Sequence, residues 1–165
     1  MELNDLKTKQ AYIKLLTDVL KKKSEVLNRL MSITEQQEKM IASDAFDEEQ
    51  FLQTITLKEE QIQNLSKLDT GFEQLYESVK EEMVTNIGKY ATEVTRMKEQ
   101  ITDITDQSVK LQALEKRNKS KLDHLFAKKH RDIKNSRVSS QTAVNYYKTM
   151  ANQHEPQSFF YDKKN

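Results

Sequence analysis

Side chains that could carry out acid–base or metal chemistry are scattered along this chain of 165 residues. The three histidines are His124, His130 and His154, and the first two lie six residues apart, so they would face different sides of a helix. Carboxylate pairs such as Glu59–Glu60 are sequence neighbours whose side chains diverge. Cysteine is absent, and neither a Gly-rich phosphate loop nor a Gly-x-Ser-x-Gly motif occurs. We therefore expect no catalytic residue, no metal site, no cofactor and no enzymatic activity.

A basic segment, residues 116–137, is the next feature that could recognise a partner. It holds nine Lys or Arg residues against two Asp. A nucleic-acid interface favours such a stripe but also uses stacking aromatics, and this segment contains only Phe126. Residues 1–106 carry a net charge of −7 and residues 107–165 one of +8, within a total of +1. Pairing between acidic and basic helices of one bundle is the favoured interpretation, and we expect no nucleic-acid partner.

Aromatic residues gather near the C-terminal end, where five of the twelve lie in the last twenty positions. Such a cluster either folds back on the main body as a clasp or offers an apolar surface to another protein, and both alternatives stay open. The candidate partner-binding residues are Tyr146, Tyr147, Met150, Phe159, Phe160 and Tyr161.

Helices must position these groups, because the chain has too few turn-forming residues for a sheet-based fold. It contains two Gly and one Pro, far below the usual share. From residue 6 to residue 41, apolar residues recur at the three- and four-residue steps of a buried helical stripe. We predict an all-α fold, an elongated antiparallel bundle of three long helices, or of four, with coiled-coil-like packing. The bundle is expected over residues 1–151, with helices at about 4–42, 48–87 and 89–135, a weaker helix to 151, and an irregular tail over 152–165.

A few residues indicate where these helices end. Asp47, followed by Gln50, resembles a capping box before the second helix. The apolar spacing continues across Gly71, so we predict a kink or local loosening there and no reversal. Gly88 stands in a position favoured just after a helix end. A turn at Gly88 gives three antiparallel helices, which the need for self-contained burial favours. Without that turn, one helix of about ninety residues would need a partner chain.

The apolar stripe contains residues that we expect to hold the helices together. Val26, Leu114 and Leu122 are assigned to the core. Asn118 lies between the two leucines, four residues from each. A polar residue at such a position either fixes the register of the helices or marks a place where the stripe rotates outward. Ser108 fills a similar gap.

Nothing in the sequence predicts insertion into a membrane. No run approaches the ~18 apolar residues of a membrane span, and the first residues do not resemble a signal peptide. The absence of cysteine is compatible with a reducing compartment. We therefore expect a cytoplasmic protein.

Several segments together resemble the FlgN-like flagellar export chaperones, a family of bacterial flagellum biogenesis. The similarity covers most of the chain. It is carried by residues 57–60 (LKEE), 65–72 (LSKLDTGF), 111–118 (LQALEKRN), 146–150 (YYKTM) and 157–164 (QSFFYDKK).

This resemblance implies an all-helical cytoplasmic chaperone of flagellar type III protein export. Members of that family bind the amphipathic C-terminal helix of hook-filament junction (hook-associated) proteins, prevent premature assembly and deliver them to the export apparatus. Their own C-terminal part contributes to the contact, which here implies Tyr146, Tyr147 and Met150, and then residues 159–161. The alternative from another class is a structural coiled-coil protein that dimerises or tethers without chaperone activity. A homodimer is open under both hypotheses.

Overall fold

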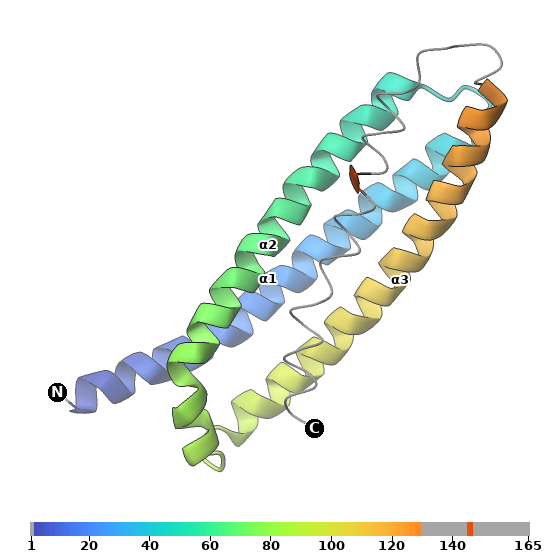
Figure 1. Ribbon diagram of the computed structural model, residues 1–165. Helices are drawn as coiled ribbons and strands as arrows, with labels where there is room; N and C mark the ends of the chain where they lie inside the picture. The colour runs from blue at the N-terminus through green and yellow to red at the C-terminus, as the bar shows by residue number, and fades with distance from the viewer. Residues whose placement is uncertain (1, 130–144, 147–165) are drawn as a thin grey trace.

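Three long helices form the protein in the computed structural model, which describes residues 2–129 and 145–146. They are α1 (Glu2–Ala42), α2 (Glu48–Thr85) and α3 (Ala91–Lys129). The three run antiparallel in sequence order and give an elongated bundle (Figure 1). Helix α1 packs against both α2 and α3. The described residues contain no strand, and the predicted all-α antiparallel bundle is confirmed. Of the weaker fourth helix, only Asn145 and Tyr146 are described, and both are helical.

Helix α2 begins with an N-cap residue, Asp47, directly after the connection from α1. The side chain of Asp47 accepts hydrogen bonds from the backbone N–H groups of Glu49, at 3.0 Å, and of Gln50, at 3.2 Å. These bonds satisfy two of the donors that a helix start leaves open. Glu48 and Glu49 add negative charge at the positive end of the helix dipole. Asp47 therefore caps the start of α2, as the sequence predicted.

The chain reverses between α2 and α3, so the alternative of one continuous helix is wrong. Helix α2 ends with the backbone N–H of Asn86 donating to the carbonyl of Glu82 at 3.0 Å. Lys89 and Tyr90 then donate backbone N–H groups to the carbonyl of Asn86. Gly88 lies in this turn without a positive φ, so the reversal does not depend on the left-handed conformation that favours glycine.

Gly71 lies inside α2, which is helical on both sides of it. The chain does not reverse there, as the continuous apolar spacing predicted. A Cβ atom added at Gly71 would meet no atom within 4 Å. Close packing against a neighbouring helix is therefore not what this glycine provides.

The core follows a regular three-and-four spacing along each helix. On α1 the buried positions run from Ile13 through Leu16, Leu20, Leu27 and Leu30 to Ile41. The same spacing also buries polar residues in every helix: Lys23, Thr34 and Gln37 on α1, Thr54 and Lys58 on α2, and Ser108, Glu115 and Asn118 on α3. A heptad seam with this many buried polar side chains requires partners for them inside the bundle.

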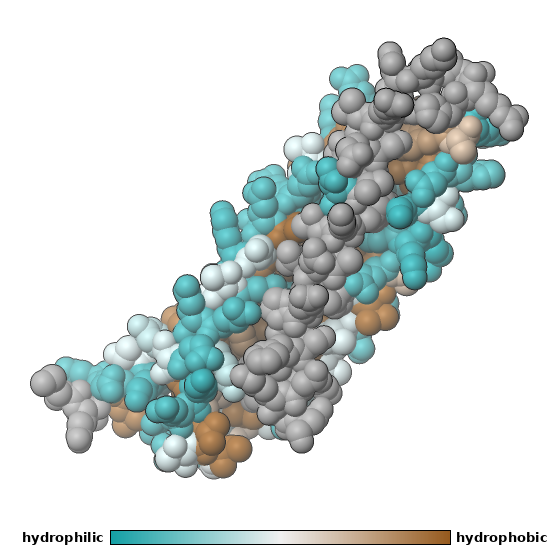
Figure 2. Space-filling view, viewed as in Figure 1, coloured by the Kyte–Doolittle hydropathy of each residue, from teal (hydrophilic) through white to brown (hydrophobic). Residues whose placement is uncertain are grey.

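Exposed apolar side chains lie singly along the helices and at one end of the bundle. Figure 2 shows a largely hydrophilic face with apolar surface at the end where α2 turns into α3. Val84 is 71% exposed and Ile87 is 63% exposed at this turn. None of the described helices is both long and apolar enough to cross a membrane.

Candidate functional site in the bundle interior

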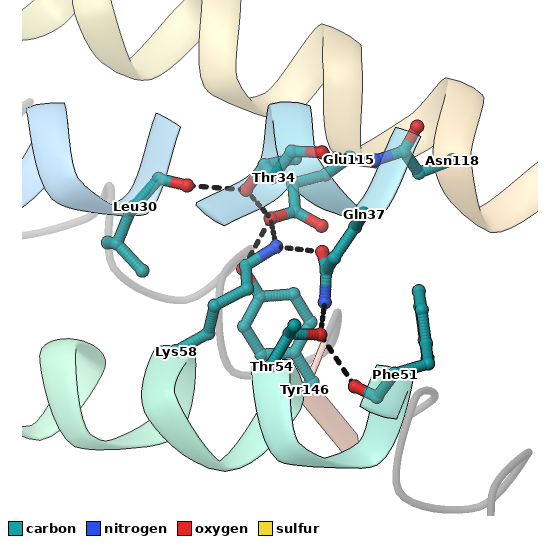
Figure 3. Close-up of polar contacts among 9 residues, drawn as sticks. All are labelled: Leu30, Thr34, Gln37, Phe51, Thr54, Lys58, Glu115, Asn118 and Tyr146. Carbon is teal, nitrogen blue, oxygen red and sulfur yellow. Dashed lines mark hydrogen bonds and ion pairs between the residues drawn. The ribbon is translucent and has the colours of Figure 1, made fainter. Parts of the chain in front are cut away.

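A cluster of buried polar side chains joins the three helices in the half of the bundle near the α1–α2 connection (Figures 1 and 3). We call it the polar cluster. Its members are Thr34 and Gln37 from α1, Thr54 and Lys58 from α2, Glu115 and Asn118 from α3, and Tyr146.

Lys58 is the centre of the cluster, with a side chain that is 0% exposed. Its ammonium group donates to the side-chain carbonyl of Gln37 at 2.7 Å and forms an ion pair with Glu115. The nitrogen also lies 4.2 Å from the ring centroid of Tyr146, within the range of a cation–π interaction. Two hydrogen bonds and one ring face therefore surround a cation that carries three donors.

The polar contacts of Glu115 all involve one of its two carboxylate oxygens, Oε1. Its Oε1 atom accepts from Lys58 Nζ and from the hydroxyl of Tyr146. The hydroxyl of Thr34 lies 3.0 Å from the same oxygen. The other oxygen, Oε2, is buried and has no hydrogen-bond partner. The carboxylate is thus neutralised and hydrogen-bonded on one side and retains an unused acceptor on the other.

The remaining members extend this network to the helix backbones. Gln37 Nε2 donates to the hydroxyl of Thr54 at 2.9 Å, and that hydroxyl donates to the carbonyl of Phe51. Asn118 Nδ2 donates to the carbonyl of Thr34 at 3.0 Å, which ties α3 to α1. The Oδ1 atom of Asn118 is buried without a partner. The cluster therefore fixes the mutual position of all three helices through polar contacts.

Burial dominates the electrostatics of Lys58. Removal of water from the ammonium group lowers its pKa from 10.5 to about 8, and the attraction of Glu115 opposes that shift only in part. The cation is still the main form at neutral pH. Lys58 and Glu115 are both buried, so the pair holds its charges and hydrogen bonds inside the bundle.

A second buried ion pair joins α1 to α2 further along the bundle. Lys23 Nζ pairs with Asp69, and the two side chains are almost entirely shielded. Burial lowers the pKa of Lys23 and raises the pKa of Asp69, while their mutual attraction opposes both shifts. Gln107 on α3 meets α1 in the same region, accepting from Ser24 at 3.0 Å and donating to Asn28 at 2.7 Å.

The residues assigned to the core and to the register lie inside the bundle. Val26, Leu114 and Leu122 are buried. Asn118 is fully buried and bonded to α1, so the alternative that the stripe rotates outward there is wrong. The polar side chain at this position links helices as a register residue does.

Of the candidate partner-binding residues, only Tyr146 is described, and it is buried in the polar cluster. This placement corresponds to the fold-back alternative for that residue, and a role in partner binding stays a prediction. The other candidates fall outside the described residues: Tyr147, Met150, Phe159, Phe160 and Tyr161.

The pairing expected of the basic segment is not found in its described part. The basic side chains of residues 116–128 are exposed, and among the described residues none of them forms an ion pair. The ion pairs that link helices instead use Lys23 and Lys58 of the acidic half as the cations. The basic side chains of this part of α3 lie at the surface, whereas its buried face carries Glu115, so alignment of the helices by the basic segment stays a prediction.

Sequence reasoning missed Lys58 and Glu115, the two charged centres of the cluster, and also Lys23. None of the three was singled out as a buried residue from the sequence. Their spacing was the available signal: Lys58 lies four residues before Ile62, and Glu115 four residues after Leu111. Within the described part of the chain, no group of His, Asp and Glu could hold a metal ion. Comparisons of the chain with protein-family models, with curated proteins and with solved structures found no match in any of the three.

Proposed function

We propose that this protein is a cytoplasmic export chaperone that holds the amphipathic terminal helix of hook-filament junction proteins and hands them to the flagellar type III export apparatus. It acts by binding alone, without catalysis or a cofactor. The class of partner comes from the resemblance to the FlgN-like family. The mode of binding is argued from the geometry of the bundle.

The observation that carries the proposal is the position of Tyr146. Helices α2 and α3 both pack on α1. Tyr146, a helical residue that follows α3 in the chain, contacts Lys58 of α2 with its ring and Glu115 of α3 with its hydroxyl. Figure 1 shows residues 145–146 beside the bundle between α2 and α3. A bundle that accepts one further helical segment through an aromatic anchor has the means to bind an amphipathic helix of a partner.

The alternative function, a coiled-coil dimerisation or tethering protein, needs an apolar stripe that is left for another chain. Here the seam from Ile13 to Ile41 on α1 is buried against α2 and α3 of the same chain. That burial favours the chaperone proposal over dimerisation through the same stripe. Sedimentation separates the two: the chaperone is expected as a compact monomer or weak dimer, and an elongated obligate dimer would support the tethering function.

Direct titration tests the proposed partner. The full chain is titrated in a calorimeter with a peptide that spans the C-terminal amphipathic helix of a hook-filament junction protein. We expect saturable binding with one peptide per chain. The control peptide has the same composition with its apolar residues spread around the helix, and it is expected not to bind because no continuous apolar face remains. Equal binding of both peptides, or binding of neither, would count against the proposal.

A further inference from the structure

The ring and the hydroxyl of Tyr146 each have their own partner in the polar cluster. The ring lies over the ammonium group of Lys58, and the hydroxyl donates to Glu115. Figure 3 shows the ring next to the side chain of Lys58, whose ammonium group lies between the ring and the carboxylate, and the hydroxyl of Tyr146 points toward the carboxylate. Phenylalanine would satisfy the cation but leave the carboxylate one donor short. The pocket therefore distinguishes Tyr from Phe through a hydrogen bond to a charged acceptor, which is among the stronger kinds.

The rest of this pocket is complete without Tyr146. Lys58 is held by Gln37 and Glu115, and Glu115 is also close to the hydroxyl of Thr34. All of these residues belong to the three long helices, whereas Tyr146 comes from beyond them. A tyrosine from another chain would find the same cation and the same carboxylate already in place.

Two unused acceptors point to a further donor at this place. Glu115 Oε2 and Asn118 Oδ1 lie one helical turn apart on α3, and both are buried without a hydrogen-bond partner. A buried carboxylate oxygen without a partner costs free energy, and a bound segment that carries a donor would remove that cost. The pocket thus offers more acceptor capacity than Tyr146 uses.

From these contacts we infer that the polar cluster is a recognition site for a tyrosine carried on the amphipathic helix of a partner, and that Tyr146 occupies this site as an internal substitute. The inference deepens the proposed function and rests on it, because it specifies which side chain a bound helix presents. A partner helix with Tyr at its central anchor position would compete with Tyr146, whereas its Phe counterpart would compete less well.

The test begins with the full-length Tyr146→Ala variant and two small molecules. The probe p-cresol reproduces the tyrosine side chain, and toluene reproduces that of phenylalanine. We expect p-cresol to raise the melting temperature of Tyr146→Ala clearly more than toluene does at equal concentration, because only p-cresol donates to Glu115. The matched control is Tyr12→Ala, which removes a half-buried tyrosine from α1 away from the cluster and should show no preference for p-cresol. An equal effect of the two molecules on Tyr146→Ala would overturn the inference.

A second measurement tests whether a helical peptide can place a tyrosine side chain in the pocket. The probes are a designed amphipathic peptide of Leu, Glu and Lys with one central Tyr, and its twin with Phe at that position. We expect the Tyr peptide to bind Tyr146→Ala about tenfold more tightly than the Phe twin, and about tenfold more tightly than it binds the wild type. Equal affinities for the two peptides would show that the site serves only the protein's own segment, and would overturn the inference.

Two provisions keep this test decisive. If Tyr146→Ala does not fold, Tyr146→Phe takes its place, since it keeps the ring and lacks the donor. The Tyr peptide should then bind Tyr146→Phe more tightly than the wild type, and equal binding would overturn the inference. None of these probes comes from a flagellar protein. A chain that prefers the phenol but binds no junction-protein helix would therefore retain the recognition site and lose the proposed function.

Discussion

Replacement of Lys58 by Met is the most direct test of the polar cluster, because it removes the cation that pairs with the buried carboxylate of Glu115. Methionine has nearly the same length as the lysine stem and fills the apolar part of the space. Glu115, which is 4% exposed, then keeps its contacts with Thr34 and Tyr146 but has no counter-charge. Loss of one partner of a buried ion pair costs about 3–5 kcal/mol.

We therefore expect the variant to lose about 3–5 kcal/mol of unfolding free energy at pH 7. That is a large part of the total for a domain of this size.

Urea denaturation followed by circular dichroism measures the loss. The double variant Lys58→Met/Glu115→Gln retains an acceptor for Tyr146 without a charge and should lie within about 1 kcal/mol of the wild type. The control is Lys80→Met, which breaks an exposed pair with Glu77 at 2.8 Å and should leave the unfolding free energy almost unchanged, because solvent screens such pairs. A loss below about 1 kcal/mol for Lys58→Met, or an equally large loss for the double variant, would refute the reasoning.

Three further outcomes are expected. Between pH 8 and pH 10.5 the unfolded chain holds a proton on Lys58 that the folded protein has released, because burial lowers its folded pKa to about 8. The unfolding free energy of the wild type relative to Lys58→Met should therefore rise with pH in this window, and a fall would mean that the attraction of Glu115 outweighs burial. Gly71→Ala should raise the unfolding free energy by about 0.5–1 kcal/mol in urea denaturation, because it removes backbone freedom inside α2 where a Cβ meets no atom within 4 Å; a loss of stability would contradict a regular helix there. Asn118→Leu should change the unfolding free energy by less than about 1.5 kcal/mol, since one oxygen of Asn118 is already without a partner, yet it should broaden the oligomer distribution in sedimentation. A single sharp monomer peak for Asn118→Leu would show that this residue does not fix the helix arrangement.

The fold was accessible from the sequence because two signals agree. The scarcity of Gly and Pro leaves few places for a turn, and the apolar residues keep one period along each helix. The start of α2 could be placed at Asp47, since its short acidic side chain is suited to the cap that it forms. The reversal after Thr85 was harder to predict. The turn is held by backbone hydrogen bonds to the carbonyl of Asn86, and Gly88 does not have the left-handed conformation. The position of the turn was therefore predicted correctly from Gly88, but the conformation expected of this glycine was not found.

The polar cluster was not accessible in the same way. A lysine at a seam position is usually assigned to a solvated face, because burial of its charge is costly without a partner. The partner of Lys58 is Glu115, on another helix and 57 positions later in the chain. Only the alignment of α2 with α3 reveals that the two charges meet. Tyr146 was singled out for its aromatic character, but its contacts with both charges depend on the same alignment.

That alignment is itself set by the charged seam positions. If α3 slipped by one heptad against α2, the seam position opposite Lys58 would be Ser108 or Leu122 in place of Glu115. The lysine would then be buried without a counter-charge, at a cost of several kcal/mol. A slip of α2 against α1 would likewise bring Ile62 or Tyr76 to the place of Asp69 opposite Lys23. An apolar seam of Leu and Ile would tolerate either slip, because one heptad resembles the next. The buried charges thus select one register, and the same selection holds the cation and carboxylate at the spacing that a tyrosine ring can bridge.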